Sequence, residues 1–234
     1  MLRALVLSIM LLNAACSTQS VLHLGDSRVI IEKTQHAAGK TFIHLHQNET
    51  TALKAAKQVV AEEGGSVITL VHNGQRNIVF NLHNVRYEFD PNRIFTDIGI
   101  KKTLSAFGHY SLDAHLEVKA LANRLIAMLP PEGKIIAVHN NNDYSIKEYL
   151  PGNSLVHDAS ALHLDKQRYY RNFYLVTRHE EFERLKNLRF NTILQAPAAT
   201  DDGSLSVYLA HRDYVNVEAG YGQLMAQIDM LKWA

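Results

Sequence analysis

Two histidines and a glutamate stand close together where an apolar run gives way to a helix-like run. In the stretch TFIHLHQNETT, which begins at residue 41, His46 and Glu49 are three positions apart. At a junction between a strand and a helix, both side chains can turn towards one point above the sheet. A neutral imidazole and a carboxylate suit Zn²⁺, and a catalytic zinc needs one more protein ligand. The motif therefore predicts two ligands of a zinc site.

His139 is the natural candidate for the third ligand. It ends the almost wholly apolar run KIIAVH and is followed by the turn-like segment NNND. His44 lies on the same strand face as His46, where it is either an outer partner of the site or, as is more common, a structural histidine. His211, which ends another apolar run before Glu218, is a further candidate for the site.

The elements that must position these residues alternate between strand and helix patterns. Residues 50–63 carry alanine and valine at helical spacing and are stopped by Gly64 and Gly65. Residues 66–72 and 76–82 predict two strands joined as a hairpin, and 205–211 a further strand. Other expected elements are strands 41–46, 134–139, 173–177, 191–195 and 213–219, and helices 111–129 (N-cap Ser111), 179–188 and 221–232. This alternation predicts a three-layer αβα domain with a mixed central sheet.

Two more segments carry groups that suit a catalytic site. RYEFDPNRIF, beginning at residue 86, holds Arg86, Asp90, Asn92 and Arg93, which are groups that bind or orient anions. Glu218 lies within the apolar run YVNVEAG. A buried carboxylate needs a cation or a chemical role, so Glu218 is a candidate catalytic residue. In α/β sheets such groups gather at the carboxyl ends of strands.

Together these features resemble the zinc carboxypeptidase superfamily, which includes metallocarboxypeptidases and the aspartoacylase–succinylglutamate desuccinylase branch. The family pattern is His-x-x-Glu, an Arg, Asp-x-Asn-Arg, a His that closes a strand, and a Glu near the end of the domain. The same order runs here from about residue 40 to 222: His46-Gln-Asn-Glu49, Arg86, Asp90-Pro-Asn92-Arg93, His139 and Glu218. The resemblance implies the zinc-carboxypeptidase type of αβα fold.

The resemblance also implies one zinc ion bound by His46, Glu49 and His139. Asp90 would accept a hydrogen bond from the outer nitrogen of a ligand histidine, expected to be His46, and so fix its tautomer.

Four residues would act on the substrate if the resemblance holds. Asn92 and Arg93 would hold its carboxylate, and Arg86 would polarise the scissile carbonyl. Glu218 would take a proton from the attacking water and pass it to the leaving amine. The candidates for the tyrosine that many family members place over the substrate are Tyr144, Tyr208, Tyr214 and Tyr221.

The whole chain fits an exported enzyme. Its 234 residues suit a single domain, and the net charge of +1 gives no basis for binding nucleic acid. We expect a signal peptide at 1–15, a tether at 16–27 and a catalytic domain at 28–234. The lone cysteine, Cys16, follows LNAA, which predicts a lipid-anchored protein of the bacterial periplasm or outer membrane. The alternative is a plain signal peptide and a secreted protein.

These expectations leave more than one function open. The first is a zinc carboxypeptidase-type hydrolase that cleaves an amide bond next to a free carboxylate, with peptidoglycan stem peptides as a substrate suggested by location. The second is an N-acyl amino acid deacylase of the aspartoacylase type. The third is a non-catalytic lipoprotein that binds carboxylated peptides on the same fold.

Overall fold

The computed structural model describes residues 16–234. Nine strands form its main sheet: β1 (Cys16–Leu24), β2 (Ser27–His36), β3 (Thr41–His44), β4 (Gly65–Val71), β7 (Ile135–Asn141), β8 (Ala159–His163), β9 (Phe173–Val176), β10 (Thr192–Gln195) and β11 (Tyr214–Gly220). Their order in the sheet is β1-β2-β4-β3-β7-β11-β9-β10-β8. β4, β3, β7 and β11 are parallel to one another at its centre, and antiparallel pairs flank them. β5 (Ile78–Leu82) and β6 (Val85–Phe89) form a separate antiparallel pair.

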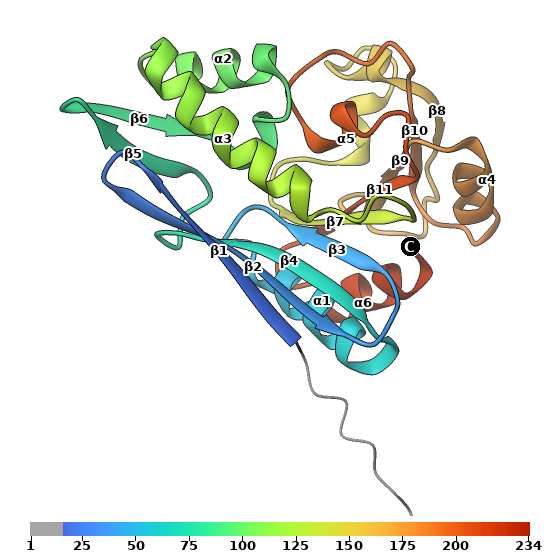
Figure 1. Cartoon of the computed structure of the whole chain (residues 1–234). Coiled ribbons are helices and arrows are strands. Elements are labelled where there is room, and N and C mark those ends of the chain that lie inside the picture. The colour runs from blue at the N-terminus through green and yellow to red at the C-terminus, as the bar shows by residue number, and fades with distance from the viewer. Residues whose placement is uncertain (1–15) are drawn as a thin grey trace, which may run out of the picture.

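Helices cover both faces of the main sheet (Figure 1). α1 (Thr50–Glu63), α4 (His179–Asn187) and α6 (Leu224–Trp233) pack on one face, and α2 (Asp97–Ala106), α3 (Leu112–Met128) and α5 (Leu205–Tyr208) lie on the other. Successive residues of a strand point to opposite faces of the sheet and pack into two separate hydrophobic cores. Phe42 packs into the core on the side of α1, whereas Ile43 packs into the core on the side of α2 and α3. The predicted α/β domain with a mixed sheet is confirmed.

The helix expected at 50–63 is present with those bounds. Its alanines and valines face the sheet, and burying a side chain such as Val59 contributes about 1.5–3 kcal/mol relative to leaving it exposed. Gly64 ends the helix with a φ of 83°, a conformation that favours glycine. Ser111 caps α3 as expected, because its hydroxyl accepts a hydrogen bond from the Ala114 amide.

The predicted tether at 16–27 is wrong. Residues Cys16–Leu24 are β1, which pairs with β2 along its whole length, from Cys16 opposite Gln35 to Leu24 opposite Ser27. β1 is the edge strand of the sheet, so most of its side chains are exposed, and its polar composition therefore resembled a linker. Residues 16–24 therefore belong to the sheet. The signal peptide expected at 1–15 lies outside the described residues.

Two further expectations fail at short apolar runs. Residues 66–72 and 76–82 do not pair as a hairpin, since β4 lies between β2 and β3 while β5 pairs with β6. The strand expected at 205–211 is instead the short helix α5. Short apolar runs suit a buried helix turn as well as a strand, and tertiary packing decides between them.

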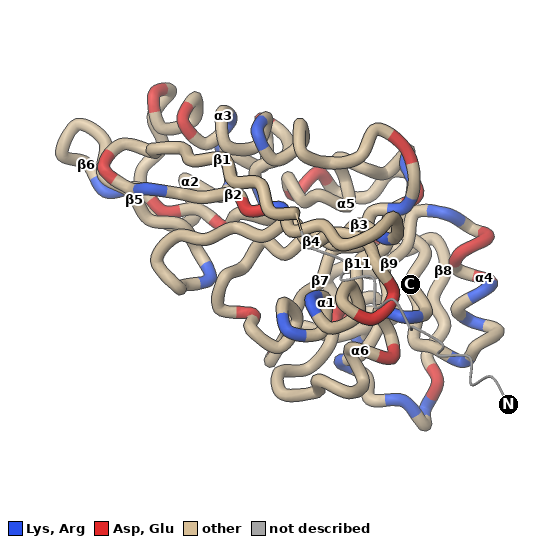
Figure 2. Tube along the Cα trace, turned by 60° about the horizontal axis from the view of Figure 1, so that its bottom comes forward, with Lys and Arg blue, Asp and Glu red and all other residues tan. Residues whose placement is uncertain are grey.

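Charged residues of both signs are interspersed over the elements (Figure 2), in keeping with the net charge of +1. Among residues 16–234, no helix is both long and apolar enough to cross a bilayer.

Candidate metal centre and active-site cavity

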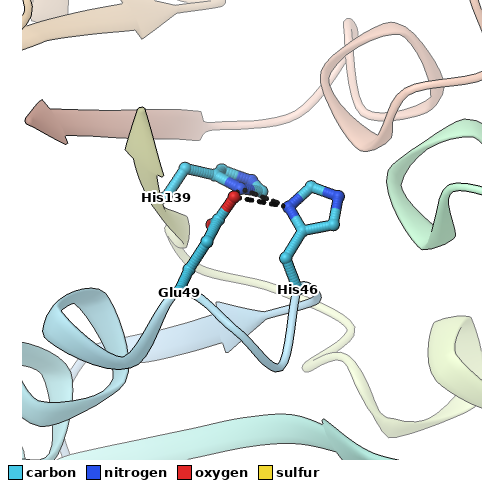
Figure 3. A group of neighbouring side chains, drawn as sticks. All are labelled: His46, Glu49 and His139. Atoms are coloured by element: carbon cyan, nitrogen blue, oxygen red, sulfur yellow. Dashed lines mark hydrogen bonds and ion pairs between the residues drawn. The ribbon is translucent and has the colours of Figure 1, made fainter. Parts of the chain in front are cut away.

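His46, Glu49 and His139 meet at the carboxyl end of the central strands (Figure 3). His46 follows β3, Glu49 directly precedes α1, and His139 lies in β7, the parallel neighbour of β3. The Nδ1 atoms of the two histidines are 3.1 Å apart. His46 Nδ1 is 2.9 Å from Glu49 Oε1, and His139 Nδ1 is 3.0 Å from Glu49 Oε2. All three side chains are buried.

Asp90 fixes the orientation of the His46 ring. Its Oδ1 lies 2.7 Å from His46 Nε2, which is the contact predicted from the sequence. The Asp90 amide is itself held by the Thr103 hydroxyl at 2.9 Å. Because Nε2 donates its hydrogen to Asp90, Nδ1 is the nitrogen that faces Glu49 and His139, and its lone pair becomes available to a metal ion when that nitrogen loses its proton.

The electrostatics of this group favour a cation. Burial alone would lower the pKa of His46, but the charges of Glu49 and Asp90 outweigh it and raise that pKa to about 9. Burial would raise the pKa of Glu49, whereas His46 and His139 together hold it well below its usual range. The carboxylates thus stay charged and attract positive charge to the imidazoles.

The donor set also fits a metal ion. Ligands of one zinc lie about 2.0–2.2 Å from it, and therefore no more than about 4.4 Å from one another. The three closest contacts within the group, 2.9, 3.0 and 3.1 Å, are all shorter than this limit. His46, Glu49 and His139 could therefore bind a metal ion.

His44 does not join the group. Its Nδ1 is 2.9 Å from the Thr69 hydroxyl and its Nε2 is 3.1 Å from the main-chain oxygen of Glu49. Burial lowers its pKa to about 4, so the ring is neutral near pH 7. Both ring nitrogens are already used, and His44 is the structural histidine of the two.

A cavity of about 540 Å³ opens beside the three ligands. This volume lies within the range of about 300–1,000 Å³ that small-molecule sites occupy. Polar and aromatic side chains from distant parts of the chain line it together with the ligands. They include Arg76, Asn92, Arg93, Asn141, Tyr144, Tyr149, Asn216, Glu218 and Tyr221.

Glu218 lies in the cavity wall next to the metal group, because it pairs with His139 across β7 and β11. Two asparagines hold its carboxylate, with Asn141 Nδ2 at 3.1 Å from Oε2 and Asn216 Nδ2 at 3.2 Å from Oε1. Burial raises its pKa, partly opposed by His139. A carboxylate with a raised pKa beside an open cavity is suited to take up and release a proton.

The structure does not place Arg86 at the cavity. Its side chain is 56% exposed on β6, and its guanidinium pairs with Glu88 at 2.6 Å. Arg76 occupies the expected position instead. It lines the cavity, pairs with Glu49 and lies 3.5 Å from Asp90 Oδ2.

Asn92 and Arg93 both line the cavity, as expected of them. They belong to a 3₁₀ helix, Pro91–Arg93, which follows directly after Asp90. The Asn92 side-chain oxygen accepts a hydrogen bond from the Leu205 amide at 3.1 Å, which leaves its amide nitrogen for the cavity. Arg93 Nε lies 3.4 Å from Asp202.

A close contact between two glycines holds this 3₁₀ helix against the loop that follows β10. A Cβ on Gly203 would lie 2.4 Å from the Gly99 Cα and 2.5 Å from the Arg93 oxygen, and Gly203 has a φ of 78°. The Gly203 oxygen also accepts a hydrogen bond from the Phe95 amide at 2.9 Å. Any larger residue at position 203 would clash with the main chain of Gly99 and Arg93 and force this contact apart.

Of the four candidate tyrosines, two line the cavity and two do not. Tyr144 and Tyr221 line the cavity, with Tyr221 half-exposed at its rim and Tyr144 hydrogen-bonded to Tyr149. Tyr208 and Tyr214 do not line it, and Tyr214 is buried within β11. His211 is exposed and also lies outside the cavity lining.

The sequence interpretation missed Arg76, Tyr149 and the two asparagines that hold Glu218. The sequence pattern places Arg76 at the start of a strand. Arg76 also follows the turn-forming residues NGQ after a buried strand, which is a place where functional side chains gather. Asn216 stands two residues before Glu218 and therefore lies on the same face of the strand. This spacing is the feature of the sequence that indicates Asn216 as a partner of Glu218.

Compared with models of known protein families and with curated proteins, the chain matches none.

Proposed function

We propose that this protein is a zinc-dependent hydrolase that cleaves an amide bond next to a free carboxylate, with a zinc-carboxypeptidase type of fold. The observation that carries the proposal is the convergence of two imidazole nitrogens and a carboxylate at one wall of a cavity that also contains Glu218. The resemblance of the ordered motifs to the zinc carboxypeptidase superfamily supports the same reaction.

His46, Glu49 and His139 would hold one zinc ion. Zinc bound by three protein ligands supplies Lewis-acid chemistry, because it acidifies water and polarises a carbonyl. Glu218 takes the proton from the attacking water and delivers it to the nitrogen of the leaving amine. Asn141 and Asn216 keep the Glu218 carboxylate in place during this transfer.

Two arginines bind the substrate at different groups. Arg93, with the free amide nitrogen of Asn92, binds the carboxylate of the substrate, since a guanidinium matches a carboxylate with two parallel hydrogen bonds. Arg76 takes the role first expected of Arg86 and donates hydrogen bonds to the oxygen of the scissile carbonyl as negative charge develops on it.

Arg76→Met is expected to lower kcat/KM by about 10²–10³-fold, the range typical for loss of one donor to a developing oxyanion. Arg86→Met is the matched control, since Arg86 is exposed and its partner is Glu88. Steady-state kinetics on both variants, with zinc content measured in parallel, test this assignment. Equal activity of the two variants would refute it.

A peptide is the favoured substrate because the cavity of about 540 Å³ has room for more than one amino-acid residue. The experiment is a hydrolysis assay with peptides, muropeptides and N-acyl amino acids, each with and without a free carboxylate, before and after treatment with a chelator. We expect cleavage of free-carboxylate peptides that is lost with the metal. Cleavage of N-acyl amino acids alone would favour the deacylase, and binding without cleavage the non-catalytic lipoprotein.

We also propose that Cys16 carries a lipid anchor and that the cavity faces away from the membrane. Cys16 lies opposite Gln35, and the register continues from there through Ser66 and Thr41 to Ile135. These residues mark the amino ends of the central parallel strands, whereas the cavity lies at their carboxyl ends. A strand of six residues spans about 20 Å. The anchor therefore lies at the amino ends of the central strands, and the cavity lies at their carboxyl ends.

Cys16→Ser is expected to release the protein from the membrane fraction without loss of activity, because Cys16 is exposed and remote from the cavity. Fractionation of cells followed by an activity assay measures both effects. Unchanged membrane association of the variant would contradict the anchor.

A further inference from the structure

Two buried amide side chains lie behind the metal group. Asn140 follows His139 in β7, and Gln227 lies on α6. They are 3% and 0% exposed, respectively. Burying an amide is costly unless its polar atoms find partners, and each of these amides has partners for both its oxygen and its nitrogen.

Their hydrogen bonds form one chain with a fixed direction. The Ala52 amide donates to Asn140 Oδ1 at 2.8 Å, so this atom must be the oxygen. Asn140 Nδ2 then donates to Gln227 Oε1 at 2.8 Å and to the Ala219 oxygen at 3.3 Å. Gln227 Nε2 donates to the main-chain oxygen of His139 at 2.9 Å. Backbone groups at both ends therefore determine how each amide is turned.

This chain joins the elements that carry the site. Ala52 lies in the first turn of α1, three residues after Glu49, and Ala219 follows Glu218 in β11. The main-chain nitrogen of Asn140 also donates to Glu49 Oε2 at 3.1 Å. The Asn140–Gln227 pair thus links the main chain near Glu49 and at His139 to the main chain next to Glu218.

We propose that Gln227 is a positioning residue of the metal centre. Through its hydrogen bonds to Asn140 and to the His139 oxygen, it fixes the position of His139 relative to Glu49. It thereby sets the distance between two of the groups that would bind the metal ion. The pair also contributes to stability, because an apolar replacement of Asn140 would leave the buried Ala52 amide without its acceptor. A positioning role is therefore tested by metal affinity and ligand geometry in the folded variants, which a purely structural role would leave unchanged. The inference rests on the proposed function of the His46, Glu49 and His139 group.

The test compares zinc affinity in Gln227→Met and Gln227→Glu. Methionine keeps the volume but removes both hydrogen bonds. Glutamate can still accept from Asn140 but cannot donate to the His139 oxygen when it is ionised. Ile228→Val is the control, because Ile228 follows Gln227 in α6 and packs into the hydrophobic core between α6 and the sheet. Zn²⁺ affinity is measured by competition with a chromophoric chelator, and ligand geometry by the absorption spectrum of the Co²⁺-loaded protein.

Both Gln227 variants are expected to bind Zn²⁺ about 10–100-fold more weakly than wild type, the usual effect of losing a partner behind a ligand. Their Co²⁺ spectra should change, while the control keeps wild-type affinity and spectrum. Wild-type affinity and an unchanged spectrum in a folded Gln227→Met would overturn the proposal. If that variant does not fold, Gln227→Glu decides in the same way, and failure of both to fold would show a purely structural role. Wild-type protein that binds no metal would instead refute the metal centre itself.

Discussion

Glu218→Gln is expected to lower kcat by about 10²–10⁴-fold, the range typical for general acid–base catalysis, while zinc remains bound. Glutamine has the same shape but cannot carry the proton from water to the leaving amine. Glu218 is not one of the three ligand residues, so the metal should be retained. Steady-state kinetics and metal analysis on the same preparation measure both effects.

The fold should tolerate this change. The side-chain oxygen of Asn216 is buried without a hydrogen-bond partner, so this amide can turn over and accept from the new glutamine. Asn141 keeps its orientation, because its Nδ2 also donates to the Arg171 oxygen, and it can still donate to the glutamine oxygen. Glu181→Gln is the matched control, because Glu181 is a buried glutamate that pairs with Lys134 and Arg184 outside the cavity. A Glu218→Gln variant as active as the control would remove Glu218 from the mechanism.

His46→Ala is expected to abolish zinc binding under conditions in which the wild type is saturated. It removes one of three ligands, which should cost more than the roughly 10–100-fold typical for an outer partner. It also leaves the Asp90 carboxylate without the imidazole nitrogen that donates to it. Isothermal titration with Zn²⁺, at matched protein concentration, measures the loss.

His44→Ala provides the comparison. His44 ends β3 two residues before His46, is also buried and is neutral near pH 7. Its Nδ1 bonds to the Thr69 hydroxyl and its Nε2 to the Glu49 main-chain oxygen. Its removal should lower stability by about 1–3 kcal/mol through the unsatisfied groups that remain, but zinc binding should persist. The reverse outcome, in which His44→Ala loses zinc and His46→Ala keeps it, would mean that the wrong histidine was chosen.

The regular elements with long periodic patterns could be predicted from the sequence. The helix at 50–63 has a clear apolar stripe and a glycine stop, and α3 has a serine cap, so local signals define both. β1 carried no such signal, because an edge strand exposes most of its side chains. The pairing of β5 with β6 could not be predicted either, since a hairpin to β4 satisfies the local pattern equally well.

The convergence of His46, Glu49 and His139 could be predicted because each of them stands near the end of a strand or at the start of a helix. The arginine that lines the cavity could not be identified from the sequence, because Arg86 stands closer in sequence to Asp90 than Arg76 does. Only the fold shows that the turn after β4 brings Arg76 to the ligands, while β6 directs Arg86 to the surface. Gln227 gave no signal at all, since its partners lie 87 and 88 residues away in the sequence.

The metal content of the wild-type protein tests the central claim most directly. Protein purified without chelator, dialysed against Zn²⁺ and then against metal-free buffer, is analysed by inductively coupled plasma mass spectrometry. The proposed function predicts one zinc ion per chain, bound by His46, Glu49 and His139. A protein that retains no zinc or other divalent metal after this treatment would contradict the proposed metal-dependent hydrolase.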